Sequence, residues 1–280
     1  MGRVHKILDL IKKPFGYSSR QTKPKALTQF IPPDHKGGVL YVDDVYYDIQ
    51  KLDKVLIGSQ AYAASINQNE LEKICTYLKV NRLEFKGLTA KDWSPLQKVS
   101  GLTELMVIWA LNVVNLSPLT NIPLTNLCIR DTKRLTDLGP ISDIKTLEVF
   151  DFSGGTGTKN TAETLVPLSH LPKLKKLTLT NLKVTESGLK PLINCKVLSE
   201  LRISNQFQTE EYAYLTAKMP GVKCDKFAAY ETYKPYDAMQ NDVMITGSRK
   251  PLLNSKNDAA RIQKYEDAFN ALVESHSANN

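Results

Sequence analysis

Hydrophobic residues recur along this chain in one spacing, apolar-x-x-apolar-x-apolar. The central apolar residues of successive copies are Val55, Leu83, Leu105, Leu127, Leu147, Leu177 and Leu201, with a weaker eighth copy at Val222. Alternate residues of a strand point to opposite faces, so the last two apolar positions of each copy predict a short strand with one buried face. Self-similarity at a near-constant period is typical of a repeat architecture, and we expect the strands to stack in chain order.

A second motif follows each strand in phase with the first. It places a proline between two apolar residues, at Pro95, Pro118, Pro140, Pro167 and Pro191. Proline has a fixed φ and lacks an N–H, so it suits the first position of a helical turn. Each repeat is therefore predicted to be a strand, a loop, a helical turn and a return.

The two motifs together resemble the leucine-rich repeat family over about residues 52–227, and the Ser-Pro-Leu units are most similar to the short repeats of internalins and phosphatase regulators. The resemblance implies an α/β solenoid, with a curved parallel sheet on the concave side and short helices or turns on the convex side. The family's usual asparagine, three residues after the third apolar position, is largely missing. The residues at those positions are Gln60, Leu88, Ala110, Thr132, Phe152, Leu182 and Gln206.

Both ends of the repeat array carry patterns expected of caps, which seal the core of a solenoid. The segment 38–49 predicts two strands with a turn at Asp43-Asp44, and Asn67 with Glu70 predicts the start of a helix over 68–79. Apolar residues spaced three and four apart predict a C-terminal helix over 258–274. We divide the chain into a basic arm (1–36), an N-terminal cap with a degenerate first repeat and helix (37–79), the repeats (80–227) and a C-terminal extension (228–280).

Charge is unevenly distributed along the 280 residues. The formal net charge is +8, and residues 1–36 contribute eight Lys and Arg against two Asp, which is 8 − 2 = +6. The arm is interpreted either as a solvated tail or as a segment that attracts nucleic acid or an anionic surface. No apolar run approaches the ~18 residues of a membrane span, and no secretory signal is recognised, so we expect a cytoplasmic protein that is not integral to a membrane.

Candidate chemistry is sparse. The four cysteines are 29 or more residues apart, without a Cys-x-x-Cys pair, so neither a zinc site nor any other cofactor is expected. The glycine-rich run at 153–160 lacks the Gly-Lys-Ser/Thr of a phosphate-binding loop. The sequence therefore favours a non-enzymatic protein.

The repeats instead predict a binding surface on the concave sheet. Apolar and aromatic side chains are expected to cluster there with charged residues at their edge, as in protein interfaces. The predicted partner-binding residues are Met106, Ile108, Trp109, Arg130, Asp131, Glu148, Phe150, Asp151, Asn181 and Arg202. The alternative is that the C-terminal extension folds back over this patch.

These features favour a protein-binding module that occludes a partner, such as a toxin or an enzyme, in the manner of bacterial immunity proteins. An adaptor or scaffold role is the alternative within the same class. Binding of nucleic acid or of a membrane surface through the basic arm is the competing hypothesis, and its affinity would fall steeply with added salt.

Overall fold

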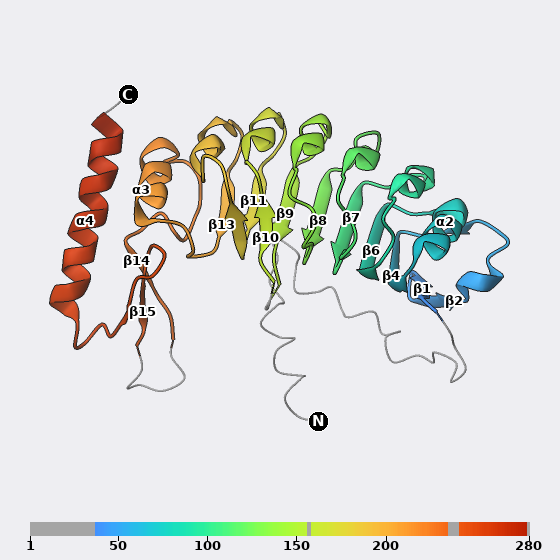
Figure 1. The fold of residues 1–280 in the computed structure, drawn as a ribbon, viewed down its shortest axis with the longest axis horizontal. Coiled ribbons are helices and arrows are strands. Elements are labelled where there is room, and N and C mark those ends of the chain that lie inside the picture. The colour runs from blue at the N-terminus through green and yellow to red at the C-terminus, as the bar shows by residue number, and fades with distance from the viewer. Residues whose placement is uncertain (1–36, 156–157, 235–240, 279–280) are drawn as a thin grey trace.

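A computed structural model describes residues 37–155, 158–234 and 241–278, and the basic arm lies outside the described residues. Seven parallel strands follow one another across the inner side of an arc (Figure 1). They are β4 (Gln60–Ile66), β6 (Arg82–Leu88), β7 (Glu104–Ile108), β8 (Asn126–Arg130), β9 (Val149–Ser153), β11 (Lys176–Leu179) and β13 (Glu200–Ile203). The strand order follows the chain, as the repeat pattern predicts.

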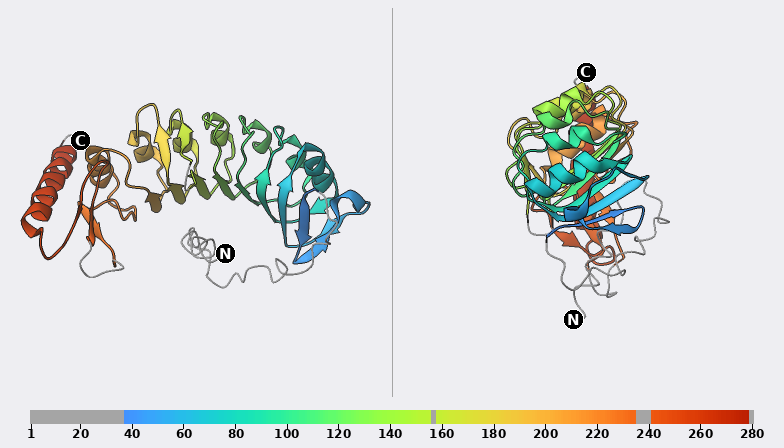
Figure 2. Two further views of the ribbon diagram at one scale, coloured as in Figure 1. Left: turned by 60° about the horizontal axis from the view of Figure 1, so that its bottom comes forward. Right: turned by 90° about the vertical axis from the view of Figure 1, so that its right-hand side faces the viewer.

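Helical segments lie on the outer side of the arc (Figures 1 and 2). They are α2 (Gln68–Tyr77), the 3-10 helices η3 (Ser94–Lys98), η4 (Ser117–Leu119), η5 (Gly139–Asp143), η6 (Val166–His170) and η7 (Lys190–Asn194), and α3 (Thr209–Lys218). Each of the five 3-10 helices has its proline in the first two positions, which confirms the role predicted for the proline motif. The leucines between strands and helices form one continuous core.

The first repeat has a different register from the predicted one. Ala61 and Ala63 of β4 pair with Leu83 and Phe85, and both alanines are buried. Val55 and Ile57, the predicted core residues, are 57% and 72% exposed. The reason is that residues 52–57 lie outside the concave sheet. Their strand β3 (Leu56–Ile57) pairs instead with β5 (Leu78–Lys79) in a separate two-stranded sheet, and the side chain that is buried there is Leu56.

The fifth repeat is shifted by three residues from the prediction. Leu127 pairs with Phe150 and Ile129 with Phe152, so the apolar triplet is Leu147-x-x-Phe150-x-Phe152. Both phenylalanines are fully buried, with stacked rings 6.3 Å apart, while Val149 is only half-buried. The prediction that Phe150 lies on the concave surface is wrong, because burying two aromatic rings removes more apolar area from water than burying Val149.

The insertion in this repeat carries an asparagine that the expected positions lack. The fully buried Asn160 accepts from the Thr132 backbone N–H at 2.9 Å and donates to the Ser153 carbonyl at 3.0 Å. It starts β10 (Asn160–Ala162), which pairs in parallel with β12 (Leu182–Val184) along the edge of the solenoid. The weak eighth repeat is reduced to an isolated bridge between Glu200 and Lys223.

The N-terminal cap confirms the predicted hairpin. β1 (Val39–Val42) and β2 (Val45–Tyr47) are antiparallel, and the turn residues Asp43 and Asp44 have φ of 44° and 69°. The Asp43 carboxylate accepts from the Ser59 hydroxyl at 2.6 Å, and the 3-10 helix η2 (Ile49–Lys51) follows the hairpin. The α2 helix begins at the predicted capping pair, Asn67 with Glu70, and Glu70 also binds the Gly38 N–H.

The C-terminal extension closes the other end of the arc. It forms a small antiparallel sheet of β14 (Tyr230–Thr232), β15 (Val243–Ile245) and β16 (Leu252–Leu253), followed by α4 (Ala259–Ala278). The helix confirms the one predicted over 258–274 and lies beside α3, with Phe269 in the main core (Figure 2).

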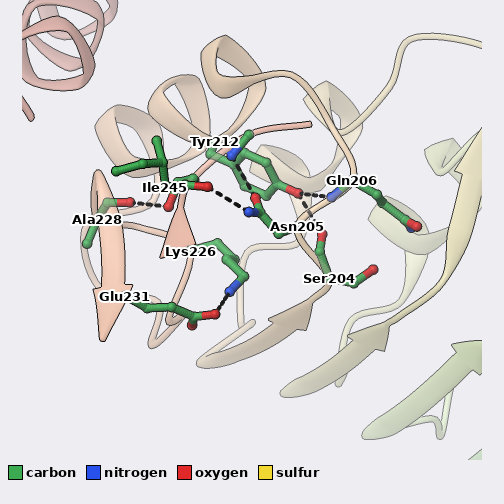
Figure 3. Close-up of polar contacts among 10 residues, drawn as sticks. Ser204, Asn205, Gln206, Tyr212, Lys226, Ala228, Glu231 and Ile245 are labelled. Carbon is green, nitrogen blue, oxygen red and sulfur yellow. Dashed lines mark hydrogen bonds and ion pairs between the residues drawn. The ribbon is translucent and has the colours of Figure 1, made fainter. Parts of the chain in front are cut away.

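Asn205, just after β13, joins the solenoid to this extension (Figure 3). Its side-chain amide donates to the Ile245 carbonyl at 2.7 Å and accepts from the Gly247 N–H at 2.6 Å. The buried Tyr212 hydroxyl donates to the Ser204 carbonyl at 2.6 Å and accepts from the Gln206 N–H. The extension is therefore attached at the C-terminal end of the sheet, away from β6–β8.

Candidate functional site on the concave sheet

The strand ladder defines which side chains share the open face of the sheet. Residues between the two buried positions of each strand form one row: Tyr62, Glu84, Met106, Cys128, Asp151, Thr178 and Arg202. The next row is Ala64, Lys86, Ile108, Arg130 and Ser153. The two rows place apolar side chains on β7 between charged side chains on β6 and β8.

The apolar centre of this face is Met106 and Ile108, both partly exposed. In the ladder Ile108 lies between Lys86 and Arg130, and Met106 lies between Glu84 and Cys128. We call these six residues, with Asp151, the concave patch. Its two cations and two carboxylates balance, so the patch is apolar at its centre and close to neutral overall.

An ion pair forms the β8–β9 side of the patch. The Arg130 Nε lies 3.1 Å from Asp151 Oδ2, and Nη2 contacts the same oxygen. The Arg130 and Asp151 side chains are 17% and 7% exposed, and Ser153 donates its hydroxyl to the other carboxylate oxygen. Each charge is therefore compensated, which a buried pair requires.

Burial also changes the protonation chemistry of the patch. Burial raises the pKa of the Glu84 carboxyl, although Arg82, Lys86 and Arg130 act in the opposite direction. Burial likewise raises the pKa of the Cys128 thiol well above its ordinary value. A thiol with a raised pKa stays protonated and is a poor nucleophile, so Cys128 acts here as a small apolar residue.

Trp109 stands at the end of β7, where the chain turns toward the convex side. It has a left-handed conformation with φ of 62°, and the equivalent residues Gly87, Asp131 and Asn181 share that conformation. Its N–H donates to the Arg130 carbonyl at 3.0 Å. The indole is 48% exposed, and Lys86 Nζ lies 5.0 Å from the ring centroid, a cation–π distance. The described part of the C-terminal extension therefore leaves Trp109 open.

The predicted residues divide into two groups. Met106, Ile108, Arg130 and Asp151 lie together on β7–β9, with Trp109 and Asp131 on the adjoining turns. The remaining four lie elsewhere.

Glu148 precedes β9 and pairs with Lys175 at 2.8 Å, and Phe150 is in the core. The Asn181 amide supports a loop by donating to the carbonyls of Gly155 and Thr158. Arg202 is on β13, four strands from β7, or ~19 Å at the usual strand separation.

The predicted binding residues did not include Tyr62, Glu84, Lys86, Val149 or Ser153, which also lie on this face. Leu105 and Leu83 are 22 residues apart, and a further step of 22 residues toward the N-terminus reaches Ala61. That step would have identified Ala61 as the buried residue and its neighbour Tyr62 as a residue of the concave face. Val149 and Ser153 carry no comparable signal, because the fifth repeat also fits the apolar spacing three residues earlier.

Within residues 37–155, 158–234 and 241–278, no three His, Cys, Asp or Glu side chains are grouped as metal ligands would be. In the same ranges no helix has both the length and the apolar composition needed to cross a bilayer.

No protein-family model and no curated protein matches this chain. Solved structures with a similar trace include internalin C2 of Listeria monocytogenes, at 18% identity and a TM-score of 0.40, over 51% of this chain and 73% of that one. Internalin F of the same organism matches at 18% identity and a TM-score of 0.42, over 65% of this chain and 50% of that one. A third similar structure is the leucine-rich repeat ectodomain of the Arabidopsis thaliana receptor kinase GASSHO1/SCHENGEN3, in complex with CASPARIAN STRIP INTEGRITY FACTOR 2. It matches at 16% identity and a TM-score of 0.39, over 55% of this chain and 19% of that one.

The class of the fold follows from the geometry of this chain itself. Each repeat contributes one parallel strand to the concave sheet and a helical segment on the convex side, which is a proline-led 3-10 helix in five repeats and an α-helix in the first and last. That is the construction of a leucine-rich repeat solenoid, as the sequence resemblance implies. The chain folds as such a solenoid, with an N-terminal hairpin cap and a C-terminal extension of a small sheet and a helix.

Proposed function

We propose that this chain is a protein-binding repeat module whose concave patch contacts the partner. The observation that carries the proposal is the open parallel sheet with Met106, Ile108 and Trp109 on or beside it. Parallel sheets are normally covered on both faces. Here the convex face is covered by leucines and helical turns, whereas apolar side chains remain accessible on the concave face of β7.

The kind of residue on this face favours a protein partner. Aromatic residues and arginine are enriched at the energetic centres of protein interfaces, and Trp109 and Arg130 are of these types. Arg130 is already held by Asp151, so its geometry is set before a partner arrives. A preorganised side chain loses less conformational entropy on binding.

Within this class we propose an inhibitor that occludes its partner, of the immunity type and of cytoplasmic location. The support is the curvature of the sheet, which lets one face contact a convex partner from several strands at once (Figure 2). An adaptor would leave the partner's activity intact, so an activity assay of the bound partner separates the two roles.

Site-specific photo-crosslinking in cells of the source organism tests the proposal. A photoreactive amino acid replaces Ile108 on the concave face or, as the matched control, Val166, which is 44% exposed on η6 of the convex face. We expect one discrete protein adduct from position 108 and none from position 166. Equal adducts from both positions, or adducts from position 166 alone, would contradict the assignment of the binding face.

A further inference from the structure

Three exposed apolar side chains form a ridge next to the concave patch, on the segment that joins β7 to η4. Trp109, Leu111 and Val114 are 48%, 48% and 56% exposed, whereas Ala110 and Val113 between them are fully buried. The alternation directs the three exposed side chains outward along one edge of the solenoid. We refer to Trp109, Leu111 and Val114 as the apolar ridge.

The ridge is confined to one repeat. The Asn112 side chain donates to the Thr89 carbonyl at 2.9 Å, which holds the segment beside the equivalent segment of the preceding repeat. The uniform step of 22 residues between β6, β7 and β8 places Thr89 and Lys133 at the position of Leu111. An apolar side chain at that position is therefore specific to this repeat, and the repeat architecture does not require it.

Cations surround the ridge on both sides. Lys86 lies over the Trp109 ring, and Lys91, Lys133 and Arg134 are exposed on the flanking segments. Among the described residues, none of these four cations forms an ion pair. We refer to them as the cationic rim.

Two carboxylates on the flanking segments are engaged in local turns. Asp92 accepts from the Ser94 N–H and hydroxyl at 2.8 and 2.6 Å, and Asp137 accepts from the Gly139 N–H at 2.6 Å. The hydrogen bonds from Ser94 lower the pKa of Asp92. The exposed members of the cationic rim, Lys91, Lys133 and Arg134, therefore remain available to carboxylates from outside the chain.

We propose that the apolar ridge and cationic rim together bind an acidic segment of the partner protein, in which an apolar side chain is flanked by Asp or Glu. The apolar side chain packs against Trp109 and Leu111, while the flanking carboxylates lie against Lys133, Arg134 and Lys86. Complementary charge of this kind increases the association rate and selects among partners. The inference rests on the proposed protein-binding function and extends its surface from the concave patch to the edge.

Selection from a random peptide display library on the full chain tests this inference. The charge-reversal variant Lys133→Glu/Arg134→Glu is compared with Lys173→Glu/Lys190→Glu, which makes the same charge change at exposed sites on other repeats. Trp109 fluorescence gives a second readout, since the only other tryptophan, Trp93, is fully buried and serves as an internal reference.

We expect selected peptides to be enriched in Asp and Glu next to aromatic or aliphatic residues. Their affinity should fall about tenfold or more in the rim variant and with added salt, but not in the control variant. Binding should also shift Trp109 emission to shorter wavelength. Peptides without acidic enrichment, or insensitive to rim reversal, would overturn the inference. A Trp109 shift with phosphatidylserine vesicles but not with peptides would also overturn it, in favour of a membrane surface.

Failure of this inference differs from failure of the proposed function. If Ile108→Glu abolishes peptide binding and rim reversal has no effect, the concave patch is the binding site and the rim inference is wrong. If rim reversal abolishes peptide binding but Ile108→Glu leaves binding of the whole crosslinked partner unchanged, the edge binds the acidic segment and the role assigned to the concave patch is wrong.

Discussion

Replacing Phe150 by alanine distinguishes the observed register of the fifth repeat from the one that the sequence favours. Phe150 is fully buried between Leu127 of the preceding strand and Leu177 of the following one, and its ring stacks on Phe152. Truncating a buried phenylalanine to alanine costs about 3–5 kcal/mol in unfolding free energy, because transfer and cavity terms add. Val149 is half-buried at the edge of the concave row, so Val149→Ala should cost only about 0.5–1 kcal/mol.

The assay is guanidinium denaturation followed by circular dichroism, with the midpoints of both variants compared with that of the unaltered chain. Midpoints are compared directly because repeat proteins do not always unfold in a single step. We expect a large drop for Phe150→Ala and a small one for Val149→Ala. The reverse ranking would show that Val149 is the core residue and that Phe150 faces the partner, which would refute the register described here.

Three further predictions concern stability. Leu127→Ala should cost about 2–5 kcal/mol in denaturant melts, because this side chain is buried in the middle of the solenoid, and a neutral result would contradict its place in the core. Asn205→Ala removes two hydrogen bonds to the extension, which together are worth about 1–3 kcal/mol. Amide hydrogen exchange should therefore become faster in β15 while β8 stays protected. Unchanged exchange in β15 would show that the Asn205 side chain does not attach the extension. Burial raises the folded-state pKa of Glu84 above 4.5, so its ionisation destabilises the fold as pH rises through that raised value. Glu84→Gln should therefore be more stable than the unaltered chain near neutral pH, with the difference shrinking below pH 4.5; a difference that does not depend on pH would contradict the shift.

Local patterns predicted most of the fold. The spacing of Leu83, Leu105 and Leu127 and the prolines after each strand determine the strands and helical turns, because both motifs act within a single repeat. The two register errors occur where the pattern is degenerate. Ala61 and Ala63 are small enough to be overlooked as core residues, and both Val149 and Phe150 are apolar, so only the pairing with β8 decides between them.

The candidate site was less predictable than the fold. Exposure of Trp109 follows from its position after the strand, which the repeat pattern already specifies. The pairing of Arg130 with Asp151, by contrast, depends on the register of β9, which the sequence leaves open. The place of the C-terminal extension depends on Asn205 bonding to residues 40 or more positions away, a contact that no local pattern encodes.

The central claim, that the concave face and its edge bind a partner protein, is tested most directly by the affinity of the crosslinked partner for Trp109→Ala. Calorimetric titration measures that affinity, and the melting temperature of the same variant serves as the control for folding. We expect Trp109→Ala to weaken binding by about 2 kcal/mol or more with little change in melting temperature, because the side chain is exposed and central to the surface. Unchanged affinity, or a loss of melting temperature as large as that of Leu127→Ala, would contradict the claim.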